Sequence, residues 1–288
     1  MRSSAAKTIV FCSFLAVVLL SIRAVALQGQ GAAKGKLYNT ARQKLLDGKQ
    51  INAHTIGRFD IKEYCEQAPH YDFTWFEMQH STITYGEVEK MIAACPKVGA
   101  TPMVRVPDAT ESDIQKATDL GALGIIVPTV DTPEKAQLAA KWARYLPAGR
   151  RSQGGGMATR HWSPEAGAYR QTFNDNMLII LMIETPIGVA NAYDIAAVPG
   201  IDVVITGNSD LTNFSGYSAK DDRYEQMLTD VRDGVVKAGK FFGTASLNYR
   251  SGHRLSKDVK LTQGGPSNDG WVNPAGGGGK KGGKKGGQ

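Results

Sequence analysis

Two acidic residues, Glu184 and Asp210, each follow a run of apolar residues. The runs are Leu178–Ile183 and Val203–Thr206. Continuous apolar runs of this length, rich in β-branched residues, are typical of parallel strands that are buried on both faces. Because α/β folds build their sites at the carboxyl ends of such strands, we expect the two acids at one rim. Carboxylates are hard oxygen ligands, so the pattern predicts a site for Mg²⁺ or Mn²⁺, with Co²⁺ as a further candidate.

Three more polar residues are predicted at the same rim. Glu77 and His80 follow another apolar run, and Arg105 lies in the next one. A guanidinium is permanently charged and can stabilise an oxyanion, whereas an imidazole titrates near neutrality and can move a proton. Each residue alone is explained as well by a helix cap or a surface ion pair. Together with the two carboxylates, they fit a reaction that passes through a metal-bound enolate.

The elements that position these residues follow a strand-then-helix order. Strands are predicted at about 50–56, 73–78, 102–106, 124–128, 178–183, 203–206, 241–245 and 259–262. Helices are predicted at 41–46, from 84, at 111–121, from 132, at 189–197 and at 222–238. Eight strands separated by helices indicate an α/β protein with a (β/α)8 TIM barrel at 36–272. The alternative is an open doubly wound sheet, for which no dinucleotide fingerprint is evident.

Two connections are expected to depart from the regular pattern. The chain directly after Asp210 is predicted as a loop. The segment 248–258, between the last two strands, is polar and has no helical face, so a short helix or none is expected there. The last strand-helix unit of the barrel is therefore predicted to be degenerate.

The first 26 residues have the layout of a secretory signal peptide. A positively charged start precedes an apolar stretch at 9–22 and small residues before Leu27. An uncleaved membrane anchor is the alternative, although this stretch is shorter than the ~20 residues that a span needs. We therefore expect a secreted or periplasmic protein with no membrane span after cleavage behind Ala26.

The net charge of +7 belongs to the two ends of the chain. The seven basic residues that account for it, with no acid near them, are Arg2, Lys7, Arg23, Lys280, Lys281, Lys284 and Lys285. The folded part is neutral, which argues against a specific nucleic-acid partner. Residues 273–288 are mostly Gly and Lys and cannot bury a core, so a disordered tail is predicted. A solubilising role for this tail is favoured over a tether to anionic polymers.

Two cysteines, Cys65 and Cys95, remain after the predicted signal peptide. An oxidising compartment permits a disulfide between them. Two cysteines in a large domain are more often small buried hydrophobes, and this is the expectation. The sequence has no CxxC pair and no HExxH, so the familiar zinc sites are not predicted.

Five short motifs, taken together, resemble the HpcH/HpaI aldolase family. They are Gln79-His80, Val104-Arg105, Pro147-Ala148-Gly149-Arg150, Ile183-Glu184-Thr185 and Gly207-x-x-Asp210-Leu211. These are class II pyruvate aldolases, among them the 4-hydroxy-2-oxoheptanedioate and 2-dehydro-3-deoxyglucarate aldolases, and the resemblance runs from about 41 to 243. It implies a homo-oligomeric barrel and a metal-dependent aldehyde-lyase. Such an enzyme cleaves 4-hydroxy-2-oxo acids to a pyruvate-type 2-oxo acid and an aldehyde.

The resemblance also implies roles for individual residues. Glu184 and Asp210 would bind the metal, and His80, aided by Asp119, would handle the proton of the substrate hydroxyl. Asp119 is equally explained as a polar residue near a helix end. Substrate binding is implied for the residues around the pyruvyl group, namely Arg105, which would stabilise the enolate oxygen, with Met182, Gly207 and Ser209.

Three positions depart from the family pattern. Met78 stands where the family has glycine, Met182 where glutamine is common, and Asn208 where proline is usual. These changes spare the predicted metal ligands but leave the substrate open. The family's last helix has no counterpart in the tail, which leaves the oligomer open as well. The alternative function is a non-catalytic or altered barrel that binds an acidic sugar or a 2-oxo acid.

Overall fold

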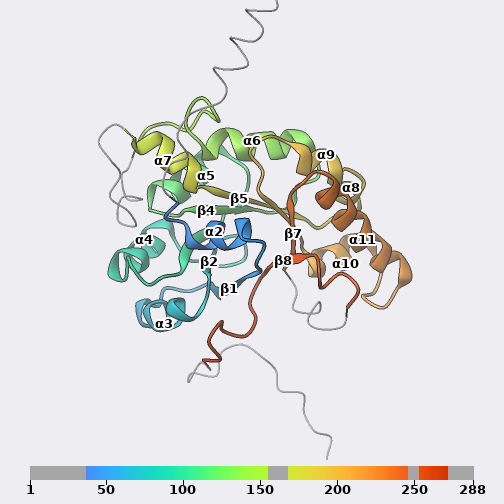
Figure 1. Ribbon diagram of the computed structural model, residues 1–288, viewed down its shortest axis with the longest axis horizontal. Coiled ribbons are helices and arrows are strands. Elements are labelled where there is room, and N and C mark those ends of the chain that lie inside the picture. Colours follow the sequence, from blue (N-terminus) through green and yellow to red (C-terminus); the bar gives the residue numbers. More distant parts are fainter. Residues whose placement is uncertain (1–36, 155–167, 246–252, 272–288) are drawn as a thin grey trace, which may run out of the picture. The chain divides into compact units, whose positions relative to one another are not determined.

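Eight parallel strands form a closed barrel in the computed structural model, which describes residues 37–154, 168–245 and 253–271 (Figure 1). Each strand pairs with its neighbour in chain order, and β8 pairs with β1. The predicted (β/α)8 barrel is confirmed and the open sheet is wrong. The predicted signal peptide and the Gly/Lys tail lie outside the described residues.

The strands coincide closely with the apolar runs of the sequence. They are β1 (Ile51–Ile56), β2 (Phe73–Glu77), β3 (Thr101–Arg105), β4 (Gly124–Val127), β5 (Leu178–Ile183), β6 (Val203–Thr206), β7 (Phe241–Thr244) and β8 (Val259–Thr262). All residues of β2 to β6 are buried, because these strands are covered on both sides. This explains their continuous apolar sequences.

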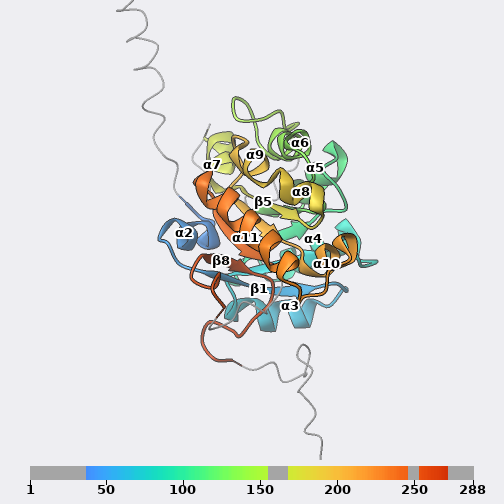
Figure 2. The ribbon, with the colours of Figure 1, turned by 90° about the vertical axis from the view of Figure 1, so that its right-hand side faces the viewer.

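The helices lie around the strands, as two views at right angles show (Figures 1 and 2). They are α2 (Thr40–Leu46), α3 (Ile61–Gln67), α4 (Tyr85–Ala94), α5 (Glu111–Asp119), α6 (Pro133–Ala143), α7 (Tyr169–Asn176), α8 (Pro186–Ala190), α9 (Ala192–Ala197), α10 (Asn208–Ser215) and α11 (Asp222–Lys237), with a 3-10 turn at Ala68–His70. The helix predicted from 84 is α4, and Thr84 and Glu87 form a capping box at its start. Among the described residues, no helix has the length and apolar character needed to cross a membrane.

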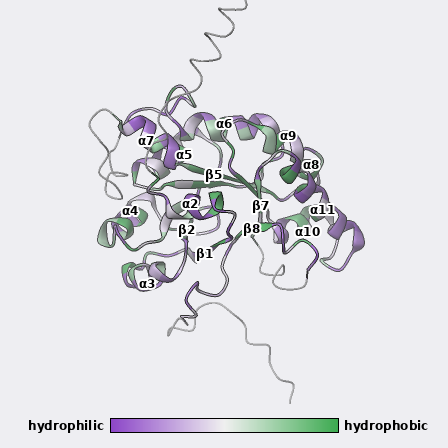
Figure 3. Ribbon diagram, viewed as in Figure 1, coloured by the Kyte–Doolittle hydropathy of each residue, from purple (hydrophilic) through white to green (hydrophobic). Residues whose placement is uncertain are grey.

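The core has two layers. One lies inside the barrel and includes Phe73, Trp75 and Met182; the other packs the strands against the helices. Figure 3 shows the hydrophobic residues along the strands, while the helices carry both colours. Helix α2 closes the amino end of the barrel, because its Ala41 and Leu45 are fully buried in the interior layer.

The structure contains helices that the sequence patterns did not predict. Helices α3 and α7 were not expected, and α10 includes the residues directly after Asp210 that were predicted as a loop. Helix α10 lacks a side-chain hydrogen bond at its N-cap, and among its residues only Leu211 is buried. Neither a cap nor an apolar face therefore marks it in the sequence. The helix expected at 189–197 is divided in two at Asn191.

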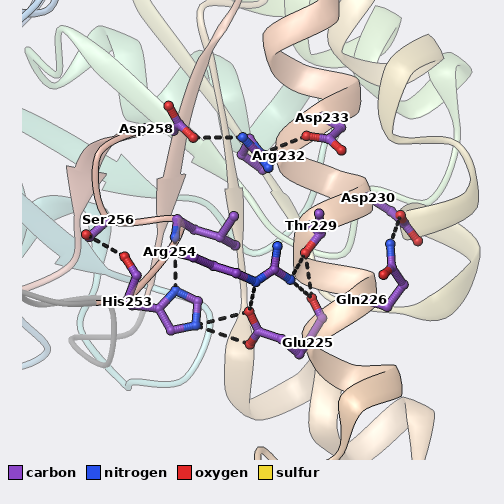
Figure 4. Close-up of polar contacts among 11 residues, drawn as sticks. Glu225, Gln226, Thr229, Asp230, Arg232, Asp233, His253, Arg254, Ser256 and Asp258 are labelled. Atoms are coloured by element: carbon purple, nitrogen blue, oxygen red, sulfur yellow. Dashed lines mark hydrogen bonds and ion pairs between the residues drawn. The ribbon is translucent and has the colours of Figure 1, made fainter.

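No helix is present at 253–258, in agreement with the degenerate last unit predicted from the sequence. Polar contacts hold this segment against α11 instead (Figure 4). Glu225 accepts hydrogen bonds from the imidazole of His253 at 3.2 Å and from the guanidinium of Arg254 at 3.1 Å. Arg232 pairs with Asp258 at 2.8 Å. Residues 246–252, the rest of this connection, lie outside the described residues.

Cys65 and Cys95 form a disulfide, which corrects the expectation of two unbonded cysteines. Cys65 lies in α3 and Cys95 caps α4, and their Cα atoms are 5.8 Å apart. Consecutive helices of the barrel pack side by side, which brings together two residues that are 30 positions apart. This distance lies in the ordinary range for a disulfide.

Candidate active site

A cavity of about 500 Å³ opens at the carboxyl ends of the strands. It is lined by His80, Arg105, Met182, Glu184, Gly207, Asn208, Ser209, Asp210, Ala245 and Gln263. Every predicted site residue except Asp119 is therefore brought to one place. Ala245 and Gln263 are additions that the sequence alone did not indicate, and Asn208 was noted there as a departure from the family pattern.

Glu184 directly follows β5 and is 1% exposed. Its Oε1 accepts two hydrogen bonds from Thr129, one from the backbone N at 2.7 Å and one from Oγ1 at 2.9 Å. Burial raises the pKa of Glu184, and the charge of Asp210 adds to this rise, while the Thr129 hydrogen bonds and Arg105 oppose it. The carboxylate therefore lies in a place that favours a positive partner.

Asp210 is the third residue of α10, which starts immediately after β6. The turn between them needs glycine at 207, since a Cβ there would overlap Glu184 Oε2 and lie 2.8 Å from Met182 Sδ. Asn208, the residue in place of the usual proline, accepts hydrogen bonds from Thr206 and Thr244 at 2.9 and 3.1 Å. These bonds fasten the start of α10 to β6 and β7.

The two carboxylates fit a divalent cation. Glu184 and Asp210 come from neighbouring strand ends and line the same cavity. Burial is the main cause of the raised pKa of Glu184, and the like charge of Asp210 adds to it. Two hard oxygen donors leave coordination positions for substrate or water, which suits Mg²⁺ or Mn²⁺. Among the described residues, no group of three or more His, Cys, Asp or Glu is arranged to hold a metal. These two would thus be the protein ligands.

Arg105 is held in one orientation at the end of β3. Its Nε donates to Glu77 Oε2 at 2.6 Å, its Nη1 lies 3.7 Å from Met182 Sδ, and its guanidinium lies 5.6 Å from the Trp75 ring centroid. Arginine has five N–H donors. The donors that remain can serve an anionic oxygen in the cavity.

Glu77, to which the sequence patterns gave no role of its own, connects Arg105 with His80. Its Oε2 accepts from Arg105 and, at 3.0 Å, from Trp75 Nε1. Its Oε1 accepts from the backbone N–H groups of Gln79 and His80 at 2.8 and 3.0 Å. The imidazole of His80 is exposed, but its backbone is held by Glu77, the same residue that binds Arg105. The sequence did contain a signal for this pair, because Glu77 ends one predicted strand and Arg105 lies at the end of the next.

Asp119 is not brought to the cavity. It is the last residue of α5, a helix that leads from the carboxyl end of β3 back to the amino end of β4. Its carboxylate pairs with Nη2 of the buried Arg151. The predicted aid to His80 therefore finds no support from its position within one chain, and the polar helix-end explanation matches this placement.

The two methionines that replace family residues lie in different places. Met78 is buried in the layer between barrel and helices, so it does not narrow the cavity. Met182 lies inside the barrel and lines the cavity. Of the two methionines, Met182 is therefore the one that changes the chemistry next to Arg105 and Glu184.

Comparisons with known proteins agree with this fold. The family model for HpcH/HpaI aldolase/citrate lyase matches residues 62–256. The hydroxypyruvate/pyruvate aldolase of Rhizorhabdus wittichii is 36% identical over 67% of this chain and 73% of its own length. The 4-hydroxy-2-oxovalerate aldolase of Novosphingobium aromaticivorans is 34% identical over 71% of this chain and 74% of its own.

Among solved structures, the HpcH/HpaI aldolase of Desulfitobacterium hafniense superposes with a TM-score of 0.69. It is 24% identical and covers 78% of this chain and 90% of its own, which supports the fold alone. The family model and the two sequence relatives carry the assignment further. This chain belongs to the HpcH/HpaI aldolase/citrate lyase family and is a lyase of the aldolase type.

Proposed function

We propose that this lyase is an exported, metal-dependent class II aldolase. It would cleave 4-hydroxy-2-oxo acids to a pyruvate-type 2-oxo acid and an aldehyde, or form them from these two compounds. The observation that carries the proposal is the cavity in which Glu184, Asp210 and Arg105 meet. The names of the two aldolase relatives, one acting on pyruvate and one on 4-hydroxy-2-oxovalerate, support this substrate class.

A divalent cation held by Glu184 and Asp210 would supply Lewis acidity toward the oxygens of the 2-oxo acid. The backbone N–H groups around Ser209, in the first turn of α10, are suited to the carboxylate of the substrate, since unpaired N–H groups at a helix start attract anions. Arg105, with its free donors, would stabilise the enolate oxygen. His80 would accept the proton of the 4-hydroxyl group.

In the cleavage direction the bond between C3 and C4 breaks. The proton of the C4 hydroxyl passes to His80, C4 becomes the aldehyde carbon, and the electron pair of the broken bond forms the enolate of the 2-oxo acid. Protonation of that enolate at C3 gives pyruvate or its analogue. The buried guanidinium of Arg105 opposes the negative charge while it exists.

The test is release of pyruvate from a panel of 4-hydroxy-2-oxo acids by the purified full chain, with Mg²⁺, Mn²⁺ or Co²⁺ or with a chelator. We expect activity only with added metal and its loss in Glu184→Ala. Glu66→Ala, which removes an exposed acid on α3, is the control and should keep full activity. Turnover that survives complete chelation would contradict the proposal.

A second candidate, a barrel that binds an acidic sugar or a 2-oxo acid without turnover, is motivated by Met182. Its thioether faces Arg105 at a position where the family commonly has a polar residue. Calorimetry would distinguish the two. Binding of a 2-oxo acid without product from any member of the panel would favour this candidate over the aldolase.

Export and a homo-oligomer are part of the proposal. The Cys65–Cys95 disulfide supports export, because such bonds persist in oxidising compartments. Large exposed apolar side chains, among them Leu146, Ile187 and Phe214, support contact with further subunits. Fractionation of cells that express the full chain tests the first point, and light scattering of the purified protein tests the second.

A further inference from the structure

Thr129, in the loop between β4 and α6, has a backbone conformation that is rare for its residue type. Its φ is +48°, and it is the one described residue other than glycine with a positive φ. A β-branched residue is disfavoured in this region, because its Cβ substituents crowd the backbone. Such conformations persist where the surrounding structure enforces them, and they gather at functional sites.

The loop is fastened on both sides of Thr129. The N–H of Val130 donates to Met182 O at 2.9 Å, and the hydroxyl of Thr185 donates to the Asp131 carboxylate. The side chain of Asn191 donates to Asp131 O at 2.8 Å. The segment 129–131 therefore follows the end of β5 and the start of α8 closely.

This close approach depends on a glycine in the facing element. At Gly188, in α8, a Cβ would lie 2.8 Å from the backbone oxygen of Val130. No side chain can be placed there without moving the loop. The geometry around Thr129 is thus determined by contacts on two elements and not by Thr129 alone.

The result of this geometry is that both donors of Thr129 reach the same oxygen of Glu184. The backbone N–H and the hydroxyl donate to Oε1, and Oε2 lies against Gly207 at the cavity. The two oxygens of one carboxylate therefore have different surroundings. Oε1 is occupied by protein donors, and Oε2 is the oxygen left for a cation.

We propose that Thr129 is a positioning residue, which fixes Glu184 so that it binds the divalent cation through Oε2 alone. The inference rests on the proposed function, because it requires that Glu184 is a metal ligand. Partners of this kind behind a ligand typically change metal affinity 10- to 100-fold when they are removed. Thr129 itself is not among the residues that line the cavity.

The test is the Kd for Mn²⁺ of the purified full chain, measured by the electron paramagnetic resonance signal of free Mn²⁺. Thr129→Val keeps the shape and loses the hydroxyl, and we expect its Kd to rise about 10-fold or more. Thr129→Ser keeps the hydroxyl and is expected to stay within about twofold of the wild type, since it restores the same hydrogen bond. Thr229→Val removes a hydroxyl bonded to backbone on α11 and is the control, with an unchanged Kd.

Thermal unfolding without metal separates positioning from stability. A merely structural role would shift the unfolding midpoint of Thr129→Val and leave its Mn²⁺ affinity as in the wild type, which would overturn the inference. Equal weakening in Thr129→Ser and Thr129→Val would also overturn it. If the wild type itself fails to bind Mn²⁺, the proposed function falls together with the inference. Affinity lost in Thr129→Val and kept in Thr129→Ser supports both.

Discussion

Glu77 and Arg105 end adjacent strands in the same register, and their side chains pair at 2.6 Å between Oε2 and Nε. Both side chains are about one-tenth exposed. The second carboxylate oxygen of Glu77 accepts from the backbone of His80. The buried carboxylate of Glu77 thus links the guanidinium of Arg105 to the segment that carries His80.

Glu77→Gln is expected to lower both activity and stability. The amide of glutamine keeps the shape but loses the charge that orients Arg105. Both oxygens of Glu77 accept hydrogen bonds from N–H groups, so the NH₂ group of the amide would face one of these donors and lose that bond. We expect the free energy of unfolding to fall by about 1.5–3 kcal/mol, the usual contribution of a hydrogen bond to a charged group. Urea unfolding and kcat measure the two effects. Glu66→Gln, on the surface of α3, is the control, and an unchanged kcat in Glu77→Gln would contradict the linking role.

Gly207→Ala is expected to reduce metal affinity without unfolding the protein. The added methyl group would meet Glu184 Oε2 and Met182 Sδ, so the carboxylate must shift from the position in which it faces the cavity. Gly86→Ala is the matched control, because no atom lies within 4 Å of a Cβ at that position in α4. Calorimetric titration with Mn²⁺ should show weaker binding for Gly207→Ala alone. Equal affinities of the two variants would refute this prediction.

Reduction of the Cys65–Cys95 disulfide is expected to destabilise the protein by about 3–4 kcal/mol. The bond closes a loop with a sequence separation of 30, and a cross-link of this length removes that much chain entropy from the unfolded state. Unfolding in denaturant, with and without a reductant, gives the difference. The double variant Cys65→Ala with Cys95→Ala should be insensitive to the reductant. Two thiols that react in the untreated native protein would show that the bond is absent.

His54 is expected to make the protein less stable in mild acid. Burial lowers the pKa of His54 below its ordinary value of 6.5, although the neighbouring Glu63 partly offsets this effect. The unfolded chain therefore takes up the proton at a higher pH than the folded chain does. The stabilisation is complete above pH 6.5 and is lost as the pH falls from 6.5 toward the lowered pKa.

The comparison of wild type with His54→Gln tests this sign. Urea unfolding at several pH values on both sides of the ordinary pKa should show a steeper loss in the wild type, by up to about 1.4 kcal/mol per pH unit. Parallel pH profiles would mean that His54 does not contribute.

The barrel was predictable from the sequence because its strands are covered on both faces. Burial on both faces requires continuous apolar runs such as Leu178–Ile183. The polar residue that follows such a run lies at the rim formed by the carboxyl ends of the strands. His80, Arg105, Glu184 and Asp210 could all be found in this way. The short helix α7 could not, since it has no side-chain cap and a polar sequence.

Other features depend on contacts that a linear pattern does not contain. The disulfide needs the packing of α3 against α4, and the role of Glu77 needs the register of β2 with β3. Thr129 is ordinary as a sequence letter, and only its φ and its two bonds to Glu184 set it apart. Asp119, whose role came from the family resemblance, ends α5 and pairs with Arg151 within the chain, so its suggested part in catalysis stays a prediction.

Helix α2, which closes the amino end of the barrel with Ala41 and Leu45, leaves the opposite rim for exchange with solvent. Glu184 is almost fully buried there, whereas His80 is exposed. A 2-oxo acid held at Glu184 would therefore sit beneath the aldehyde, and the two would enter and leave in a fixed order. We expect the aldehyde to depart first, so that pyruvate inhibits cleavage competitively and the aldehyde inhibits it noncompetitively.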